Sequence, residues 1–215
     1  MQKTLLTIPP PLSIEEAIAI IDHNIGVNLR TLSDHFVITQ PNVIPKQKGW
    51  AGLTVERLLG LAPNSSQSAD FETWELKLCS LIKKKSGILD IKDPMALTML
   101  KPKTLHDVAF ENSHLADKTK MILVVCRLYQ DHSELDTPLL GYAQYIPSAE
   151  EITRVRQEYE HAQWLIQSQG ITGLKEFTGE LLALRPYQDG YWRWYAQRLW
   201  VRQMLSTFQG ANTAR

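Results

Sequence analysis

The chain has 215 residues, of which 44% are apolar and 21% are charged, which is enough for a sizeable core in one domain or in two lobes. Its 23 basic and 23 acidic residues balance, so composition gives no general indication of a nucleic-acid partner and leaves only local basic patches to consider. No apolar run approaches the roughly 20 residues that span a bilayer, and the N-terminal segment lacks a signal-peptide core, so we expect a cytoplasmic protein. Cys79 and Cys126 lie in apolar runs and are expected to be buried free thiols.

The sequence predicts three helices before residue 61. Ser13 and Glu16 form an S-x-x-E capping box that starts the first helix. Gly60 provides a C-terminal stop for the third helix. The predicted helices cover residues 14–23, 31–36 and 49–59.

A central group of strands and two further helices follow. Residues 62–68 are expected to form a loop, and the lysine-rich segments 83–85 and 92–103 exposed connections. Strands are predicted over residues 71–79, 120–128 and 139–146. Helices are predicted from a second capping box at Ser148 and Glu151, and over residues 192–208. No Pro/Gly linker separates these elements, so residues 1–215 are interpreted as one mixed α/β domain.

One predicted strand, within "ADFETWELKLCS" (69–80), carries charge on one face. Residues 73, 75, 77 and 79 share that face, whereas Trp74, Leu76 and Leu78 share the other and form a candidate core face. Glu75 and Lys77 therefore project side by side. Asp70 has the opposite parity and reaches the same space only from a preceding turn, which "SQSAD" can form.

A turn carboxylate followed by Glu-x-Lys suits phosphodiester hydrolysis. Two carboxylates supply the hard oxygen ligands that Mg²⁺ prefers, and a lysine can orient the attacking water or stabilise developing charge. The pattern alone is common, because a solvated strand face produces it readily. The alternative is a surface Glu75–Lys77 ion pair worth about 0–1 kcal/mol.

The helix over residues 49–59 adds a third carboxylate. Glu56 has the apolar neighbours Leu53 and Leu59, and a carboxylate beside a core stripe is costly unless it is paired or bound to a metal. Lys48 precedes a Gly-Trp-Ala-Gly helix start, where free N–H groups could meet a phosphate. The alternative is an ordinary amphipathic helix with an exposed Glu56–Arg57 edge.

Four segments together resemble the MutH family of strand-nicking endonucleases of bacterial mismatch repair, which lies in the PD-(D/E)xK nuclease superfamily. They are "KGWAGLTVERLLG" (48–60), the Asp70, Glu75 and Lys77 set, "FENSHLADKTKMILVV" (110–125) and "LRP" (184–186). Their order and spacing are similar to those of the family, and the resemblance spans roughly residues 8–208. The wider family includes restriction endonucleases that cut GATC and related sites.

The resemblance implies a restriction-endonuclease-like fold, in which a central mixed sheet is flanked by helices. Its N-terminal lobe would carry the active site and its C-terminal lobe the DNA reader, and the two would form a DNA-binding cleft. The implied activity is Mg²⁺-dependent, sequence-specific cleavage of double-stranded DNA by a monomer, with Mn²⁺ able to substitute for Mg²⁺. A repair role would add a MutL-like partner.

The resemblance also assigns residues. The metal-binding carboxylates would be Glu56, Asp70 and Glu75, and the catalytic lysine would be Lys77. Lys48 would belong to the active site or its phosphate contacts, and His114 and Lys118 would lie near the DNA or the active-site rim. Arg185 would be a DNA reader, because its side chain is suited to a guanine edge. Tyr187 and Tyr191, in the segment after Arg185, are further candidates for DNA contact.

Some features depart from the family pattern. Only four residues separate Asp70 from Glu75, two fewer than the family has, although a change of two preserves strand parity. Tyr187 stands where the family has a basic residue, and the reading loop is shorter. The alternatives are therefore a restriction endonuclease with its own recognition site and a non-catalytic DNA-binding relative.

The aromatic segment 190–203 has two readings. It could stack on bases or contact phosphate, through Arg193 or Arg198, or it could pack its aromatic side chains into the core. The histidines at 106, 132 and 161 lack ligand-like spacing, so no zinc site is expected.

Overall fold

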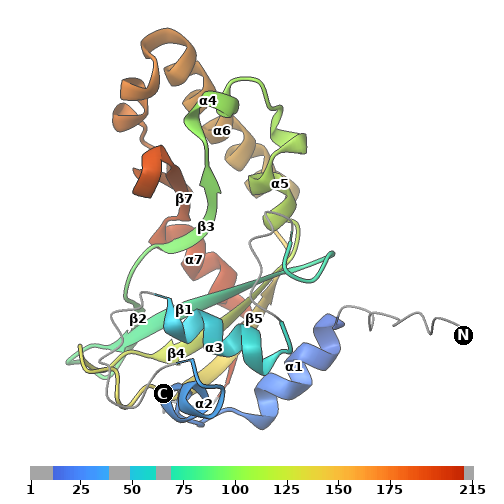
Figure 1. The fold of residues 1–215 in the computed structure, drawn as a ribbon, viewed down its shortest axis with the longest axis vertical. Coiled ribbons are helices and arrows are strands. Elements are labelled where there is room, and N and C mark those ends of the chain that lie inside the picture. Colours follow the sequence, from blue (N-terminus) through green and yellow to red (C-terminus); the bar gives the residue numbers. More distant parts are fainter. Residues whose placement is uncertain (1–11, 39–48, 62–68, 211–215) are drawn as a thin grey trace, which may run out of the picture.

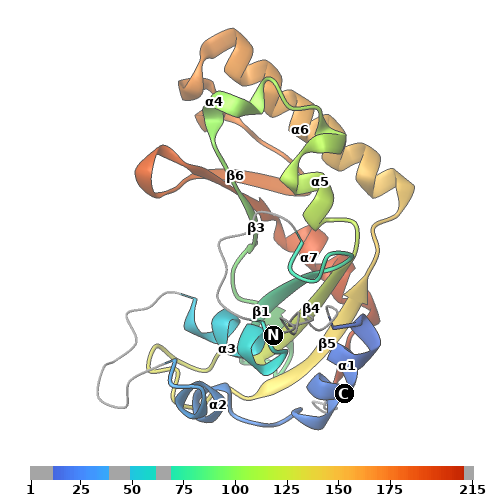
Figure 2. The same ribbon diagram turned by 45° about the vertical axis from the view of Figure 1, so that its right-hand side comes forward.

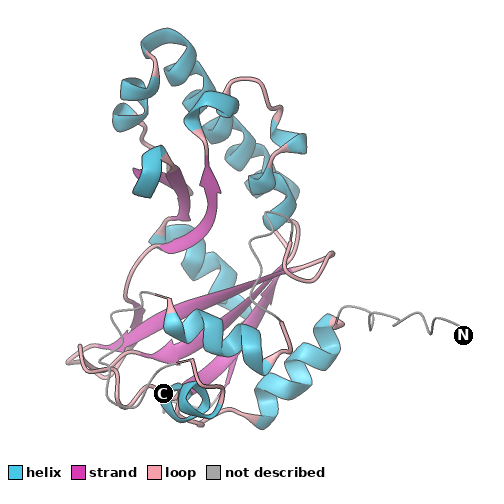
Figure 3. Cartoon of the chain, in the orientation of Figure 1, coloured by secondary structure: helices cyan, strands magenta, loops and turns pink. Residues whose placement is uncertain are grey.

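Two β-sheets organise the chain, of which the computed structural model describes residues 12–38, 49–61 and 69–210. A five-stranded sheet forms the lower lobe in Figure 1, and a three-stranded sheet lies in the upper lobe. Helices flank both sheets (Figure 3), so the predicted mixed α/β class is confirmed. None of the helices within the described ranges is long and apolar enough to cross a membrane.

The lower sheet is mixed. Its strand order is β2-β1-β4-β5-β8, in which β1 and β4 are parallel and the other neighbours are antiparallel. The parallel pair is possible because the chain leaves the lower sheet after β2 and crosses over through the upper lobe before it returns as β4. The strands are β1 (Glu75–Lys83), β2 (Leu89–Ile91), β4 (Ile122–Leu128), β5 (Leu139–Tyr145) and β8 (Gln209–Gly210).

Three N-terminal helices cover one face of this sheet. Ile21, Leu29 and Val55 come from different helices and share a buried cluster with Leu76 and Leu123 of the sheet. The predicted capping box of the first helix is present. The helices are α1 (Ile14–His23), α2 (Leu29–His35) and α3 (Trp50–Leu58), close to the predicted ranges.

The upper lobe contains the antiparallel sheet β3-β7-β6. Its longest helix follows a capping box at Ser148 and Glu151, as predicted. The strands are β3 (Met95–Leu100), β6 (Leu182–Pro186) and β7 (Trp192–Ala196). The helices are α4 (Pro102–Leu105), α5 (His114–Lys118) and α6 (Ala149–Gln169), and α7 (Arg198–Met204) lies between the two sheets.

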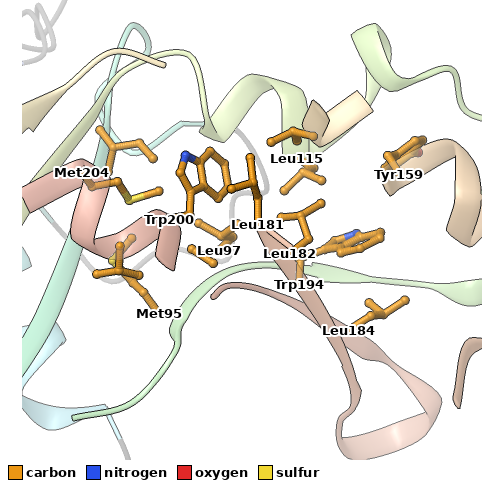
Figure 4. Close-up of a cluster of buried hydrophobic side chains, with 14 of the residues drawn as sticks. Met95, Leu97, Leu115, Tyr159, Leu181, Leu182, Leu184, Trp194, Trp200 and Met204 are labelled. Atoms are coloured by element: carbon orange, nitrogen blue, oxygen red, sulfur yellow. The ribbon is translucent and has the colours of Figure 1, made fainter. Parts of the chain in front are cut away.

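One hydrophobic cluster runs through both lobes. It joins Cys126 and Leu81 of the lower sheet to Trp194 of the upper sheet and Trp200 of α7, and Figure 4 shows both tryptophans among aliphatic side chains. The indole of Trp200 is fully buried and donates a hydrogen bond to the Tyr145 hydroxyl at 2.9 Å. This continuous packing fixes the orientation of one sheet against the other.

Three local predictions are wrong. Residues 192–196 form strand β7, because Trp192, Trp194 and Ala196 alternate toward the core, and the helix starts only at Arg198. Residues 95–100 were predicted to be an exposed connection, but they form strand β3, which pairs with β7. Strand β1 begins at Glu75 rather than at residue 71, and the residues before it form a turn.

Candidate active site

The entrance to β1 presents a turn and a strand end to the same space. The backbone N–H of Glu75 donates to the Met121 carbonyl at 2.9 Å, where β1 begins its parallel pairing with β4. The preceding turn is held by the stacked rings of Phe71 and Trp74, whose centroids are 3.8 Å apart, and Glu72 adopts a positive φ of 62°. A positive φ is unfavourable for a residue other than glycine, so the turn stores some backbone strain.

This turn brings Asp70 back onto the strand. One carboxylate oxygen of Asp70 accepts the backbone N–H of Leu76 at 3.3 Å, and the Glu75 carboxylate accepts the backbone N–H of Asp70 at 3.1 Å. These two side-chain to backbone bonds hold the Asp70 turn against the start of β1 despite the short spacing between Asp70 and Glu75. Asp70 therefore lies in a turn, as strand parity predicted.

Glu75 is a buried carboxylate with two lysine partners. Its side chain is 1% exposed, and Lys118 Nζ lies 2.9 and 3.1 Å from its two oxygens. Lys77 Nζ also pairs with Glu75 Oε1, so the prediction that these two side chains project into one space is confirmed. Lys118 Nζ is 3.9 Å from Asp70 Oδ1, which links all four groups. Burial of this charge is tolerated because each oxygen has a cationic or N–H donor.

Lys118 lies deeper than the rim position expected from the sequence. It is 7% exposed and ends α5, whose N-terminus is capped by the Ser113 side chain. Asp117 on the same helix accepts the backbone N–H of Ala69 at 3.3 Å, which ties α5 to the turn before β1. A lysine three residues after the buried Leu115 occupies the apolar face of a helix, and this spacing was the available sequence signal. His114, by contrast, is exposed at the start of α5.

The Glu56 carboxyl, on α3, interacts electrostatically with the same cluster. Burial, followed by the negative charge of Asp70, raises the pKa of the Glu56 carboxyl above its ordinary value of 4.5. The charge of Glu75 acts in the same direction, and the two lysines of the cluster oppose it. Three carboxylates therefore share one electrostatic environment, and a bound cation would relieve their repulsion.

The donor types suit a hard divalent cation, although the side chains do not form a closed coordination site. Among the described residues, no group of three or more His, Cys, Asp or Glu side chains is placed to hold a metal ion. The reason at Glu75 is visible, because lysines and a backbone N–H already occupy both oxygens. For Glu75 to act as a metal ligand, one of these donors would have to leave its oxygens. Lys48 lies outside the described residues.

The predicted DNA-contacting residues lie on the other lobe. Arg185, Tyr187 and Tyr191 belong to the β6–β7 hairpin, whose tip projects from the upper lobe on the same side as α3 in Figure 2. Tyr187 is 40% exposed, and the Arg185 guanidinium lies 5.3 Å from the centroid of the Tyr195 ring. Trp192, next to this group, is instead buried at 6% exposure and belongs to the core.

The two cysteines are free and buried, as predicted. They are direct neighbours in the parallel β1–β4 register, on the face that packs against the upper lobe. The contact with Cys79, followed by burial, raises the pKa of the Cys126 thiol, so it is not a reactive thiolate.

Comparison with known proteins points to one family. The family model described as "DNA mismatch repair enzyme MutH" matches residues 59–158, a range that contains Asp70, Glu75, Lys77 and Lys118. The DNA mismatch repair protein MutH of Vibrio cholerae is 27% identical over 182 residues, covering 83% of this chain and 80% of that protein. MutH of Haemophilus influenzae is 26% identical over 180 residues, covering 82% and 78%, and that of Pectobacterium atrosepticum is 28% identical over 169 residues, covering 75% and 69%.

Proposed function

We propose, on the basis of its confirmed similarity to the MutH family, that this chain is a divalent-metal-dependent endonuclease that nicks double-stranded DNA in mismatch repair. The observation that carries the proposal is the cluster at the start of β1, where Asp70 and Glu75 meet Lys77 and Lys118. The relatives are named as DNA mismatch repair proteins, and the similarity covers most of both chains.

A catalytic role explains features that a surface ion pair does not. An exposed Glu75–Lys77 pair would contribute little and would need no second lysine, whereas this carboxylate is 1% exposed and holds two ammonium groups. Keeping such a group buried is costly compared with apolar packing. The Glu56 carboxyl, which responds to these charges, has a raised pKa, and perturbed ionisable groups of this kind gather at functional sites.

The chain's own residues have separable tasks in this mechanism. Asp70 and Glu56 would hold Mg²⁺ with Glu75, and the bound cation would polarise the scissile phosphate and activate a water. Lys77 is the more accessible lysine, with 15% of its side chain exposed against 9% for Lys118, so it can reach the phosphate or the attacking water. Lys118 holds Glu75 in place and adds positive charge beside the reacting group. Mn²⁺ has similar oxygen-donor preferences and is expected to substitute.

DNA would lie between the lobes, in contact with both. The lower lobe would supply Glu56, Asp70, Glu75 and Lys77, and the upper lobe would supply Lys118 and His114 of α5 together with the β6–β7 hairpin. Lys48, outside the described residues, is a further proposed phosphate contact. Arg185 presents a planar fork suited to a guanine edge, and the exposed ring of Tyr187 can stack or pack in a groove. We propose a single domain that acts as a monomer, with a MutL-like protein as partner in repair.

The decisive experiment is incubation of plasmid DNA with the protein and Mg²⁺. Methylated, hemimethylated and unmethylated plasmids are compared, and the DNA ends are mapped by sequencing. Cleavage is expected with Mg²⁺ or Mn²⁺ and not with EDTA. It should be lost in Lys77→Ala and Asp70→Ala and kept in Lys83→Ala, a control at the exposed end of the same strand. Metal-dependent cutting that survives both site substitutions would refute the assignment.

The same experiment tests a second candidate function, that of a restriction endonuclease. The short β6–β7 hairpin favours this alternative. The connection between β6 and β7 spans only residues 187–191, which leaves little room for an extended reading loop. A double-strand break at a fixed site, blocked by methylation of both strands, would indicate a restriction endonuclease. Nicks confined to the unmethylated strand of hemimethylated DNA would indicate the repair enzyme.

A further inference from the structure

The open face of the upper sheet carries two arginines directly opposite each other. Arg185 of β6 and Arg193 of β7 are cross-strand partners, so their side chains leave the sheet on the same side. The flanking Trp192 and Trp194 are buried, which places Arg193 on the face away from the core. Opposed partners in an antiparallel pair have Cβ atoms about 4.5–5.5 Å apart, a distance at which like charges are destabilising.

Aromatic rings hold both guanidinium groups without neutralising them. Arg193 Cζ lies 3.7 Å from the centroid of the Tyr187 ring, and Arg185 Cζ lies 5.3 Å from that of Tyr195. A guanidinium that rests on a ring keeps its in-plane N–H groups available for another partner. Among the ion pairs between described residues, neither arginine has a carboxylate.

A third cation extends this face. Lys101, just after β3, lies with its ammonium 5.4 Å from the centroid of the Tyr191 ring, beside the same hairpin. Arg198, by contrast, donates to the Lys92 carbonyl and so contributes to the fold of the chain. Of the two arginines considered for phosphate contact in segment 190–203, the geometry therefore favours Arg193.

We propose that Arg193 is a DNA-contacting residue that binds a backbone phosphate next to the base edge expected for Arg185. The charge balance supports a phosphate rather than a second base contact. A base edge is neutral and leaves the repulsion between the two arginines in place, whereas a phosphate lowers it while accepting N–H bonds from the Arg193 fork. Tyr187 then orients the Arg193 guanidinium through the contact between its ring and Arg193 Cζ. This inference rests on the proposed cleavage of duplex DNA.

The test is the salt dependence of binding to duplex DNA, measured by fluorescence anisotropy with fluorescent duplexes of several sequences. Arg193→Ala is expected to weaken binding roughly 10- to 100-fold on every duplex, the range for hydrogen bonds to a charged group. The slope of log K against log salt should become shallower by about 0.9, the value for one phosphate contact. Arg193→Lys should keep the wild-type slope while losing part of the affinity, because a lysine keeps the charge and lacks the planar fork.

Arg156→Ala is the matched control, because Arg156 is an exposed arginine of the same lobe that already pairs with Glu111. It should bind as the wild type does. The thermal midpoint of Arg193→Ala should equal or exceed that of the wild type, since one of two opposed charges is gone. This measurement separates weaker binding from unfolding.

Two results would overturn the inference alone. One is an Arg193→Ala protein with the wild-type affinity and slope. The other is a loss confined to particular sequences together with an altered pattern of mapped cleavage sites, which would indicate a base contact. A wild-type protein that fails to bind any duplex would instead refute the proposed function, and the inference with it.

Discussion

Replacement of Lys118 by methionine tests how the buried carboxylate is held. Methionine has a similar length and helix propensity and removes only the charge and its hydrogen bonds. In the wild type, Lys118 Nζ contacts both oxygens of Glu75, a side chain that is 1% exposed. The variant leaves that carboxylate with Lys77 and one backbone N–H, in a site that water scarcely reaches.

Breaking a buried ion pair by removal of one partner costs about 3–5 kcal/mol, and the remaining lysine places this case at the lower end, about 3 kcal/mol. For a domain of this size, such a loss lowers the thermal midpoint by roughly 6–12 °C. Urea titration of wild type and variant measures the free energy of unfolding, and the midpoint of urea unfolding should fall without a change in its slope.

Two further proteins make the result interpretable. Lys120→Met removes an exposed lysine just after α5 that pairs with Asp117 of that helix. This change should lower the free energy of unfolding by no more than about 1 kcal/mol. The double variant Lys118→Met/Glu75→Gln removes the unpaired charge and should recover part of the lost stability. If Lys118→Met costs no more than Lys120→Met, or the double variant is less stable than the sum of its single changes, the buried pair does not stabilise Glu75 as argued.

Three other changes have definite expected outcomes. Glu56 has a folded-state pKa raised above 4.5 by burial and by neighbouring carboxylates, so its ionisation costs stability as the pH rises from about 4.5 through that higher pKa. Glu56→Gln should therefore have a higher thermal midpoint than the wild type at about pH 8 and an equal one near pH 4, and an equal difference at both pH values would contradict this account. Gly141→Ala should release β8 from the sheet, because φ is +149° and an added Cβ would lie 2.1 Å from the Gln209 carbonyl oxygen; faster amide exchange along β5 and β8 is the readout. Trp200→Phe should cost roughly 2–4 kcal/mol in urea titration, since it leaves a cavity and removes the donor to Tyr145.

Local signals predicted most of the helices and strands β1, β4 and β5 of the lower sheet, but not its short edge strands β2 and β8. Capping boxes at Ser13 and Ser148 depend on residues three apart, so they can be read without knowledge of the fold. Strand β7 was missed because a run of aromatic residues and arginines fits helical and alternating patterns alike. Its partner β3 lies about a hundred residues earlier in the chain, and only that pairing decides that Trp192, Trp194 and Ala196 face the core.

Strand parity was the reliable guide to the site. It placed Glu75 and Lys77 side by side and required Asp70 to come from a turn, and both features are present. The depth of Lys118 could not be predicted from parity, because its contact with Glu75 joins residues 43 apart in the chain and depends on the parallel pairing of β1 with β4. The effect of Glu56 on this cluster likewise depends on how α3 packs.

The two proposed tasks of the molecule lie on different sheets. The carboxylates and lysines that would cut the DNA are set by the β1–β4 pairing and by α5, whereas the arginines that would hold and read it are set by the β6–β7 pairing. The shared core around Trp200 fixes one sheet relative to the other. Side chains on the open face of β6 and β7 point away from that core, so substitutions there can alter DNA contact while the Glu75 cluster keeps its geometry. The DNA target of the molecule can therefore change through the β6–β7 hairpin without any change in the residues around Glu75.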